Sequence, residues 1–403
     1  MEIVIIGGGP AAVAAALEAK LHRSDANVTL VTEEACEPYE KPPLSKGVLL
    51  GQSEPNEALI AGPNGLASQG ISVRLATRCE GIDRAARKIV TNHGDLPFDA
   101  LVIATGSLPR ELPNLPLGMD RVHYLRTQAD ARALRGALLE RRRIAIIGAG
   151  LIGLEVAASA AELGLAVTVF EAAPRVMARA CCEEIGMKVL AEHRRRGVEV
   201  RLETMLRDVS RQDDGSLRLT TADGDVCLAD HVVIGTGVTP NDALAAGAKL
   251  KTDDGILIDE GCRTSDPAIF AGGDCTRFPG PDGMVRLENW RHALDHGGVA
   301  GRNAAGAQDV YRAVPSFWSE QYDLYIQGVG WADPEAVSVT RPLEGNSSLI
   351  VHAKDGRVCG ATGINVQRDI AMIRRLIERN IPIDSAALAD PDQPFAAMLK
   401  VKA

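Results

Sequence analysis

Apolar and polar positions divide the first part of the chain into alternating strand and helix patterns. Residues 3–6, IVII, form an unbroken apolar run, which is typical of a parallel strand covered on both faces. The alanine-rich segment 11–23 follows with the composition of a helix, and the apolar run 28–31, VTLV, predicts the next strand. These patterns predict a strand, a helix and a strand in succession at the start of the chain.

The same succession recurs further along, where the apolar runs 144–147 and 166–170 enclose a helical segment at 154–164. In both units a glycine-rich turn separates the first strand from the helix, whose free N–H groups can bind a diphosphate. One such turn is a weak signal, but two in the same context predict two dinucleotide sites. The candidate cofactor-binding residues of the two turns are Gly7, Gly9 and Ala12, and Gly148, Gly150, Ile152 and Gly153.

An acidic residue follows the second strand of each unit, where a carboxylate can bind the ribose hydroxyls of a dinucleotide. In the first unit this residue is Glu33 or Glu34, and in the second it is Glu171. Two alanines rather than arginines come directly after Glu171, so the second site is expected to prefer NADH to NADPH. The nearby Arg175 and Arg179 leave the degree of that preference open.

Length and charge narrow the class of protein. A chain of 403 residues is expected to form two or three domains. Its formal charge of -9 argues against a nucleic-acid-binding protein, and the arginine runs 141–143 and 194–196 are interpreted as solvated helix ends and strand starts. No apolar run approaches the roughly 18 residues of a membrane helix, and the eight cysteines have no regular spacing. A cytoplasmic protein that binds no membrane is expected.

Four further segments carry a resemblance to a known family. The segments 94–110, GDLPFDALVIATGSLPR, and 264–275, TSDPAIFAGGDC, resemble the ATG and GD motifs of flavoproteins of the glutathione reductase superfamily. The segments 37–49, EPYEKPPLSKGVL, and 317–330, FWSEQYDLYIQGVG, closely resemble the ferredoxin reductases of bacterial oxygenase systems. The resemblance extends over essentially the whole chain. It implies FAD in the first site, NADH in the second and a two-iron two-sulfur ferredoxin as the electron acceptor.

The resemblance also implies an α/β fold with two Rossmann-like domains and a smaller α+β C-terminal domain. The FAD-binding domain is expected at residues 1–110 and 231–317, the inserted NAD-binding domain at 111–230 and the C-terminal domain at 318–403. In the C-terminal domain, strands are expected around AVSVT, SSLIVHA and RVCGATGIN, followed by the helix RDIAMIRRLIER. The arginines of that helix could guide an acidic ferredoxin, as could those at 141–143.

Several site residues are assigned by their match to the family. Asp274 would hold the ribityl hydroxyls of FAD, Trp290 would lie against its ring system, and Arg126 would line the site. Lys46 would lie near the flavin and pair with Glu155, which the pattern places in the first turn of the second helix. These two are the candidate catalytic residues. The remaining candidate cofactor-binding positions are Cys79, Thr105, Gly106 and Gly237.

The sequence lacks an internal destination for the electrons. Disulfide reductases of the superfamily need a spaced cysteine pair, but Cys36 stands alone and Cys181 and Cys182 are adjacent. His292 and His296 share a helix face, but no third ligand is indicated, so no metal is predicted and a solvated helix flank is expected.

The electrons must therefore leave on a partner or on oxygen. The predicted function is electron transfer from NADH through FAD to a ferredoxin that supplies an oxygenase. The alternatives are another acceptor, namely rubredoxin, a small molecule or oxygen, or an NADH-switched interaction protein related to apoptosis-inducing factor. Whether the protein is a monomer or a homodimer stays open.

Overall fold

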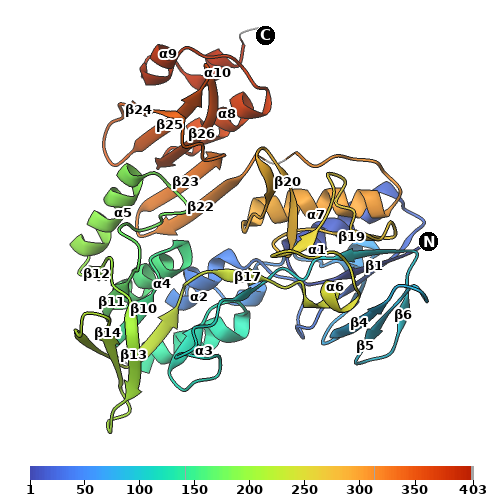
Figure 1. The fold of residues 1–403 in the computed structure, drawn as a ribbon, viewed down its shortest axis with the longest axis horizontal. Coiled ribbons are helices and arrows are strands. Elements are labelled where there is room, and N and C mark those ends of the chain that lie inside the picture. Colours follow the sequence, from blue (N-terminus) through green and yellow to red (C-terminus); the bar gives the residue numbers. More distant parts are fainter. Residues whose placement is uncertain (141, 313, 401–403) are drawn as a thin grey trace. The chain divides into compact units, whose positions relative to one another are not determined.

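The two glycine-rich turns each follow the central strand of a five-stranded parallel sheet, as Figure 1 lets the reader trace. The computed structural model describes residues 1–140, 142–312 and 314–400. Within it the chain divides into two compact units. Unit 1 comprises Met1–Lys41, Ser53–Leu108 and Val238–Ala313, and unit 2 comprises Pro42–Gln52, Pro109–Gly237 and Val314–Ala403.

Unit 1 is organised around a parallel sheet in the order β19-β7-β1-β2-β3. The central strand is the apolar run at the start of the chain, and Ile3 to Ile6 are buried because side chains on both faces of the strand are covered. The sheet strands are β19 (Ile269–Ala271), β7 (Ala100–Ile103), β1 (Glu2–Ile6), β2 (Asn27–Val31) and β3 (Ser72–Arg74).

Two helices of unit 1 pack closely against each other (Figure 1). They are α1 (Pro10–His22) and α7 (Trp290–Ala304), and α1 connects β1 to β2 as the sequence predicts. Smaller elements complete the unit. They are β4 (Cys79–Asp83), β5 (Lys88–Thr91), β6 (Leu96–Pro97), β8 (Ser107–Pro109), β17 (Val238–Pro240), α6 (Ala243–Gly247), β18 (Ile256–Leu257), β20 (Thr276–Gly280), β21 (Gly283–Val285) and the 3-10 turns Pro55–Glu57 and Ala67–Gln69.

Unit 2 repeats the parallel arrangement in the order β12-β11-β10-β16-β9. Its strands are β12 (Glu199–Arg201), β11 (Ala166–Phe170), β10 (Arg143–Ile147), β16 (His231–Ile234) and β9 (Val122–Tyr124). The other elements of this part are η1 (Pro42–Ser45), α2 (Gly47–Leu50), α3 (Gln128–Glu140), α4 (Leu151–Glu162), α5 (Glu183–Arg195), β13 (Leu206–Arg211), β14 (Leu217–Thr221) and β15 (Val226–Ala229).

The end of the chain forms an antiparallel sheet in the order β22-β23-β26-β25-β24. The strands and helices predicted from the C-terminal sequence are all present, since an apolar and polar alternation and a turn at KDGR are strong local signals. The elements are β22 (Ser316–Gln321), β23 (Leu324–Gly330), β24 (Val337–Arg341), β25 (Ser348–Lys354), β26 (Arg357–Ile364), α8 (Gln367–Glu378), α9 (Ser385–Ala389) and α10 (Phe395–Met398).

The α/β fold class is confirmed, with two parallel sheets and a C-terminal antiparallel sheet. The units differ from the expected domains, and the C-terminal sheet groups with unit 2 rather than forming a third unit. Strand β16 pairs with β10, so the return expected at residue 231 comes after Gly237 in the structure. The segment Pro42–Gln52 groups with unit 2. Among the described residues, no helix has both the length and the apolar character needed to cross a bilayer.

Candidate functional site

The first glycine turn leaves the start of α1 open to an anion. Gly7 has φ +134°, and a Cβ at this position would lie 2.2 Å from the carbonyl oxygen of Ala104, so glycine is required. Gly9 is the N-cap of α1, with no side-chain cap and no other atom within 4 Å of the position of a Cβ. The first helical turn carries no acidic residue. This combination of free N–H groups and open space suits a diphosphate.

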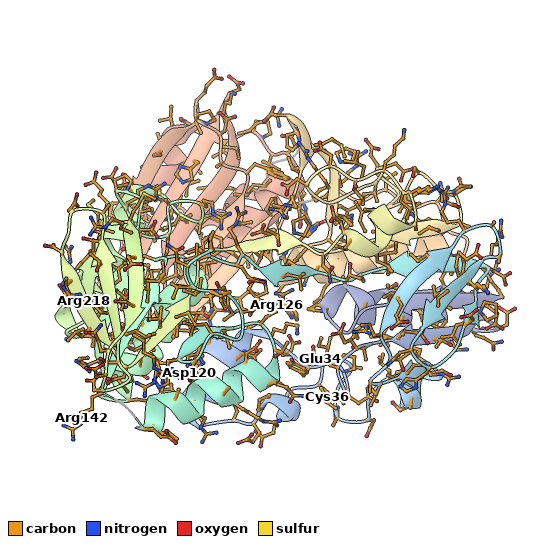
Figure 2. The ribbon with its side chains drawn as sticks, turned by 60° about the horizontal axis from the view of Figure 1, so that its bottom comes forward. Glu34, Cys36, Asp120, Arg126, Arg142 and Arg218 are labelled. Carbon is orange, nitrogen blue, oxygen red and sulfur yellow. The ribbon has the colours of Figure 1, made fainter. Side chains whose placement is uncertain are left out.

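The two glutamates after β2 lie in different surroundings. The side chain of Glu34, labelled in Figure 2, accepts a hydrogen bond of 2.6 Å from Tyr39 and pairs with Lys41 at 3.2 Å. Glu33 is exposed. Thr32 is buried, and a Cβ on Gly8 would lie 2.4 Å from its hydroxyl oxygen. The carboxylate of Glu34 is therefore already held by neighbours on its own loop.

The ATG and GD motifs lie together within unit 1. Ser107, directly after the ATG motif, donates a hydrogen bond of 2.9 Å to the carboxylate of Asp274. The hydroxyl of Thr105 donates to the carbonyl of Asn241 at 2.6 Å, and Gly106 has φ +69°. Gly273, which precedes Asp274, lies against α1, since a Cβ there would be 2.8 Å from the Cβ of Ala11. The structure therefore brings Asp274 close to the first helical turn of α1.

Two further predicted positions of unit 1 have defined partners. Trp290 is the first residue of α7, and its indole N–H donates to the carboxylate of Glu40. Burial raises the pKa of Glu40, and the hydrogen bond from Trp290 opposes that rise. Cys79 begins β4, where burial raises the pKa of its thiol to about 11. It is therefore an unreactive thiol at neutral pH.

The two histidines of α7 are buried, so the prediction of a solvated helix flank is wrong. His296 is fully buried and His292 is 3% exposed. Their rings pack with Phe278 and Tyr311, and His292 shares a 2.7 Å hydrogen bond with the Tyr311 hydroxyl. Burial lowers the pKa of both rings, to about 3 for His292, which keeps them neutral. No cluster of three metal-ligating side chains occurs among the described residues.

The second glycine turn has the same construction as the first. Gly148 has φ +101°, and a Cβ on it would lie 2.5 Å from the carbonyl oxygen of Gly235. A Cβ on Gly153 would lie 2.1 Å from the carbonyl oxygen of Gly148, so the helix can pack this closely only with glycine. Gly150 caps α4 without a side-chain bond, and Ile152 in the first turn is 46% exposed. This turn also suits a diphosphate.

Glu171 stands beside this turn. Its carboxylate accepts hydrogen bonds from the backbone N–H of Ala149 at 2.7 Å and of Ala173 at 2.8 Å. Arg175 donates to the carbonyl oxygens of Cys181 and Ala178, both at 2.7 Å. The structure thus fixes the acid next to the turn and engages Arg175 with backbone groups. Gly237, at the end of unit 2, has φ +104°.

Lys46 and Glu155 form the expected ion pair within unit 2. The Nζ of Lys46 lies 3.4 Å from the Oε1 of Glu155, and their side chains are 17% and 4% exposed. Two hydroxyls that the sequence did not single out also bind this carboxylate: Ser319 donates to Oε1 at 2.7 Å and Ser45 donates to Oε2. Both serines lie in segments that had been noted only as family signatures.

The position of Glu155 in its helix corrects one expectation. Helix α4 begins at Leu151, one turn before the segment that the sequence indicated, so the first turn carries no acidic residue. The favourable helix dipole of a first turn is therefore not what holds this carboxylate. Burial raises the pKa of Glu155, and the charge of Lys46 and the bonds from Ser45 and Ser319 oppose that rise.

The run 194–196, Arg142 and Arg126 all belong to unit 2. Arg142 projects from the chain between α3 and β10 (Figure 2), whereas Arg141 lies outside the described residues. The run 194–196 is exposed at the end of α5, as predicted. Arg126 precedes α3, and its backbone N–H donates to Asp130 at 3.1 Å. On α8, Arg375 is exposed.

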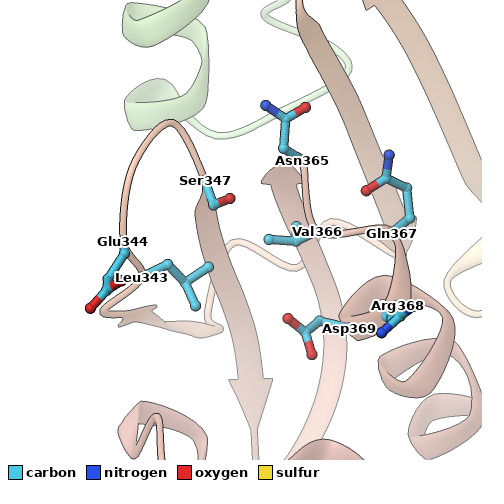
Figure 3. A pocket seen from close by; sticks show the side chains of 8 residues that line it. All are labelled: Leu343, Glu344, Ser347, Asn365, Val366, Gln367, Arg368 and Asp369. Atoms are coloured by element: carbon cyan, nitrogen blue, oxygen red, sulfur yellow. The ribbon is translucent and has the colours of Figure 1, made fainter.

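A pocket of about 390 Å³ opens at the start of α8 (Figure 3). None of the predicted cofactor positions lines it, and two carboxylates stand at its rim. The residues that line it are Leu343, Glu344, Ser347, Asn365, Val366, Gln367, Arg368 and Asp369. It is separate from both glycine turns in the sequence and carries none of the predicted chemistry.

Comparison with known proteins identifies the family. Residues 1–297 match the family described as pyridine nucleotide-disulphide oxidoreductase, and residues 316–399 match the family described as reductase C-terminal. The chain belongs to the pyridine nucleotide-disulphide oxidoreductase family. Relatives that match nearly the whole chain are named as ferredoxin reductases of oxygenase systems, so the resemblance seen in the sequence is confirmed.

Individual relatives place the chain more narrowly within the family. It is 40% identical over 394 residues to the ferredoxin–NAD(+) reductase component of the anthranilate 1,2-dioxygenase system of Burkholderia cepacia, which covers 96% of this chain and 97% of the relative. It is 36% identical to rhodocoxin reductase of Rhodococcus erythropolis, over 97% of this chain and 93% of the relative. The solved covalent complex of putidaredoxin reductase with putidaredoxin matches with a TM-score of 0.92 at 30% identity, over 99% of this chain and 98% of that chain.

Proposed function

We propose that this protein is an FAD-dependent NADH:ferredoxin oxidoreductase that supplies electrons to an oxygenase. The observation that carries the proposal is the full-length similarity to reductases named for dioxygenase systems, joined to two glycine turns that each suit a dinucleotide. When bound, FAD supplies the redox chemistry that accepts a hydride and returns electrons one at a time. The protein's own residues bind the cofactors, orient them and shield them from water.

FAD is assigned to unit 1. The open N-terminus of α1 would bind its diphosphate, and Asp274, which lies close to that helix start, would bind the ribityl hydroxyls. Glu33 is the better candidate for the adenosine ribose, because Glu34 is already paired with Lys41 and bonded by Tyr39. Thr105, Gly106, Cys79 and Trp290 remain proposed FAD contacts.

NADH is assigned to the glycine turn of unit 2. The N-terminus of α4 would bind the diphosphate, and Glu171 would accept bonds from the ribose hydroxyls. A 2′-phosphate would meet this carboxylate, and Arg175 is bound to backbone carbonyls, which supports NADH over NADPH. Ile152 and Gly237 are the other proposed contacts in this unit.

Lys46 and Glu155 are assigned to the flavin site, with Arg126 at its margin. A lysine held there supplies a positive charge where negative charge develops, and its pairing with Glu155 limits the cost of burying it. The pair is also held in place by hydroxyls, so it needs little reorganisation when the cofactors bind.

The acceptor is proposed to be a two-iron two-sulfur ferredoxin, because the relatives that match nearly the whole chain are named as ferredoxin reductases. The cysteines of the described residues offer no spaced pair suited to redox exchange. Cys181 and Cys182 are adjacent, and burial raises the pKa of the Cys181 thiol to about 12. Exposed arginines such as Arg142 and Arg375 would attract an acidic partner. If the rate of ferredoxin reduction does not fall with rising ionic strength, electrostatic attraction does not contribute to docking. A cytoplasmic monomer or homodimer is proposed.

The test is steady-state NADH consumption by the FAD-loaded protein with cytochrome c as the final acceptor, measured with and without a panel of small ferredoxins. The proposal predicts fast consumption only when a matching ferredoxin is present. Equal consumption without any ferredoxin would favour oxygen or a small molecule as the acceptor. A stable complex with NADH and negligible turnover would favour a switched interaction protein.

A further inference from the structure

A row of four hydrogen bonds in unit 2, three of them buried and the outermost partly buried, ends on the carboxylate of Glu155. It runs through α5 and β22, which lie far apart in the sequence. The hydroxyl of Tyr322 forms a hydrogen bond of 3.2 Å with the Nδ1 of His193, and the Nε2 of His193 forms one of 2.8 Å with the Oε1 of Gln321. The Nε2 of Gln321 donates to the Oγ of Ser319 at 2.9 Å, and that Oγ donates to the Oε1 of Glu155 at 2.7 Å. These four residues, Tyr322, His193, Gln321 and Ser319, are called the donor chain below.

The partners fix the direction of the donor chain. The carbonyl oxygen of the Gln321 amide can only accept, so the Nε2 of His193 carries the proton and its Nδ1 accepts from Tyr322. The amide nitrogen of Gln321 can only donate, so the hydroxyl hydrogen of Ser319 points to Glu155. Every donor therefore points toward the carboxylate, an order in which each bond strengthens the next.

The burial of the donor chain sets it apart from an ordinary polar surface. His193, Gln321 and Ser319 are fully buried, beside an apolar core that contains Leu324 and Ile326. A buried polar group is costly unless its hydrogen bonds are satisfied, so the bonds hold these side chains in one arrangement. The rigid end of that arrangement is the one carboxylate that pairs with Lys46.

We propose that the donor chain is a positioning device that holds the Glu155 carboxylate ionised and aligned beside Lys46 during reduction of the flavin by NADH. This inference rests on the proposed function for its catalytic meaning. Ser319 acts directly on the carboxylate, whereas Gln321 and His193 act through Ser319. The amide of Gln321 does not readily pass a proton, so the row orients the carboxylate rather than conducting protons to it.

Charged groups act on both ends of the row: Lys46 on Glu155, and Glu192, Glu162 and Arg196 on the end formed by His193 and Tyr322. Lys46 lowers the pKa of Glu155 against the effect of burial. At the other end, burial lowers the pKa of His193, and the hydrogen bond with Gln321 and the charge of Glu192 oppose that shift. Arg196 lies over the ring of Tyr322, 4.8 Å from its centre. His193 is therefore neutral at neutral pH, as the direction of the donor chain requires.

Removal of the Ser319 hydroxyl gives the first test. The bond from Ser319 lowers the pKa of Glu155, so the Ser319→Ala substitution should raise it, by about one pH unit for a bond to a charged group. In flavin-free protein, the infrared carbonyl band of the protonated Glu155 carboxyl, assigned by its loss in Glu155→Gln, should appear at correspondingly higher pH. This measurement does not depend on cofactor chemistry.

The FAD-loaded protein gives the second test. The rate of flavin reduction by NADH, measured by stopped flow, should fall as the pH falls through the pKa of Glu155. This acid limb of the pH profile should begin at higher pH in Ser319→Ala. At a pH within that limb the variant should be about tenfold slower. Gln321→Leu should shift the limb in the same direction by a smaller amount, since it acts one bond further away.

Ser348→Ala is the matched control, because it also removes a buried hydroxyl from the C-terminal sheet but lies outside the donor chain, bonded by Lys188. Its infrared titration and pH profile should match the wild type. If the pH profile of flavin reduction and the infrared titration of Gln321→Leu both match the wild type, the proposed role of the donor chain is wrong. This holds even if Ser319→Ala loses its flavin. If NADH does not reduce the flavin of the wild-type protein, the proposed function is wrong. The infrared titration would then still show whether the donor chain changes the pKa of Glu155.

Discussion

The close approach of α1 and α7 gives a sharp prediction for unit 1. Gly297 and Gly301 lie one helical turn apart on α7, and both face α1. A Cβ on Gly297 would lie 2.1 Å from the carbonyl oxygen of Ala11, and one on Gly301 would lie 2.1 Å from that of Ala15. The obstacle in both cases is backbone, which cannot rotate away as a flexible side chain can. Gly297→Ala should therefore force the two helices apart.

The magnitude follows from the distance. An ordinary contact begins at about 3.4 Å, so the helices would have to separate by roughly 1 Å. Such overpacking costs about 3 kcal/mol, while replacing a helical glycine by alanine returns about 1 kcal/mol. The net loss of about 2 kcal/mol corresponds to a fall in Tm of about 4–8 °C for a unit of this size. Because α1 begins at the first glycine turn, FAD affinity should fall as well.

The assay is thermal unfolding of the FAD-free protein together with titration of FAD by flavin fluorescence. Gly298→Ala is the matched control on the same helix, since its nearest neighbour would be a flexible carbon of Glu18 at 3.4 Å. The control should be as stable as the wild type or slightly more so. Equal Tm and equal FAD affinity for Gly297→Ala and Gly298→Ala would refute the reasoning.

Three further predictions, made with four substitutions, test the assigned sites. Glu155→Gln should slow flavin reduction by NADH at least tenfold and remove the acid limb of its pH profile, because Lys46 loses its charged partner; an unchanged rate in stopped-flow experiments would count against a catalytic role. Glu171→Gln should narrow the preference in kcat/KM for NADH over NADPH by about tenfold, because a carboxylate no longer repels the 2′-phosphate; an unaltered ratio would place specificity elsewhere. Glu33→Ala should weaken FAD binding more than Glu34→Ala, and the reverse order in equilibrium titration would exchange their roles.

Much of the fold could be predicted because its signals are local. The apolar runs at residues 3–6 and 144–147 are parallel strands, and the glycines that follow them mark the starts of α1 and α4. The boundaries of the two units were harder to predict from the sequence. Strand β16 belongs to the second sheet because it pairs with β10, and a pairing between distant segments leaves no local mark in the sequence.

The candidate site was predictable only where a motif carried it. Glu171 and Asp274 follow strand ends, which the sequence indicates, whereas the hydroxyl of Ser319 reaches Glu155 across 164 positions of the chain. With no third metal ligand indicated, the sequence predicts a solvated helix flank for His292 and His296, but their rings are buried, neutral and part of an aromatic cluster with Phe278. The role of such polar core residues depends on neighbours that only the folded chain supplies.

Anaerobic mixing of the purified protein with NADH, followed by visible absorbance, measures directly whether NADH reduces a flavin bound to this chain. The account predicts a yellow protein that holds one FAD per chain, whose absorbance bleaches when NADH is added and recovers when oxidised ferredoxin follows. A colourless preparation that takes up no FAD from solution, or a flavin band that NADH leaves unchanged, would contradict it.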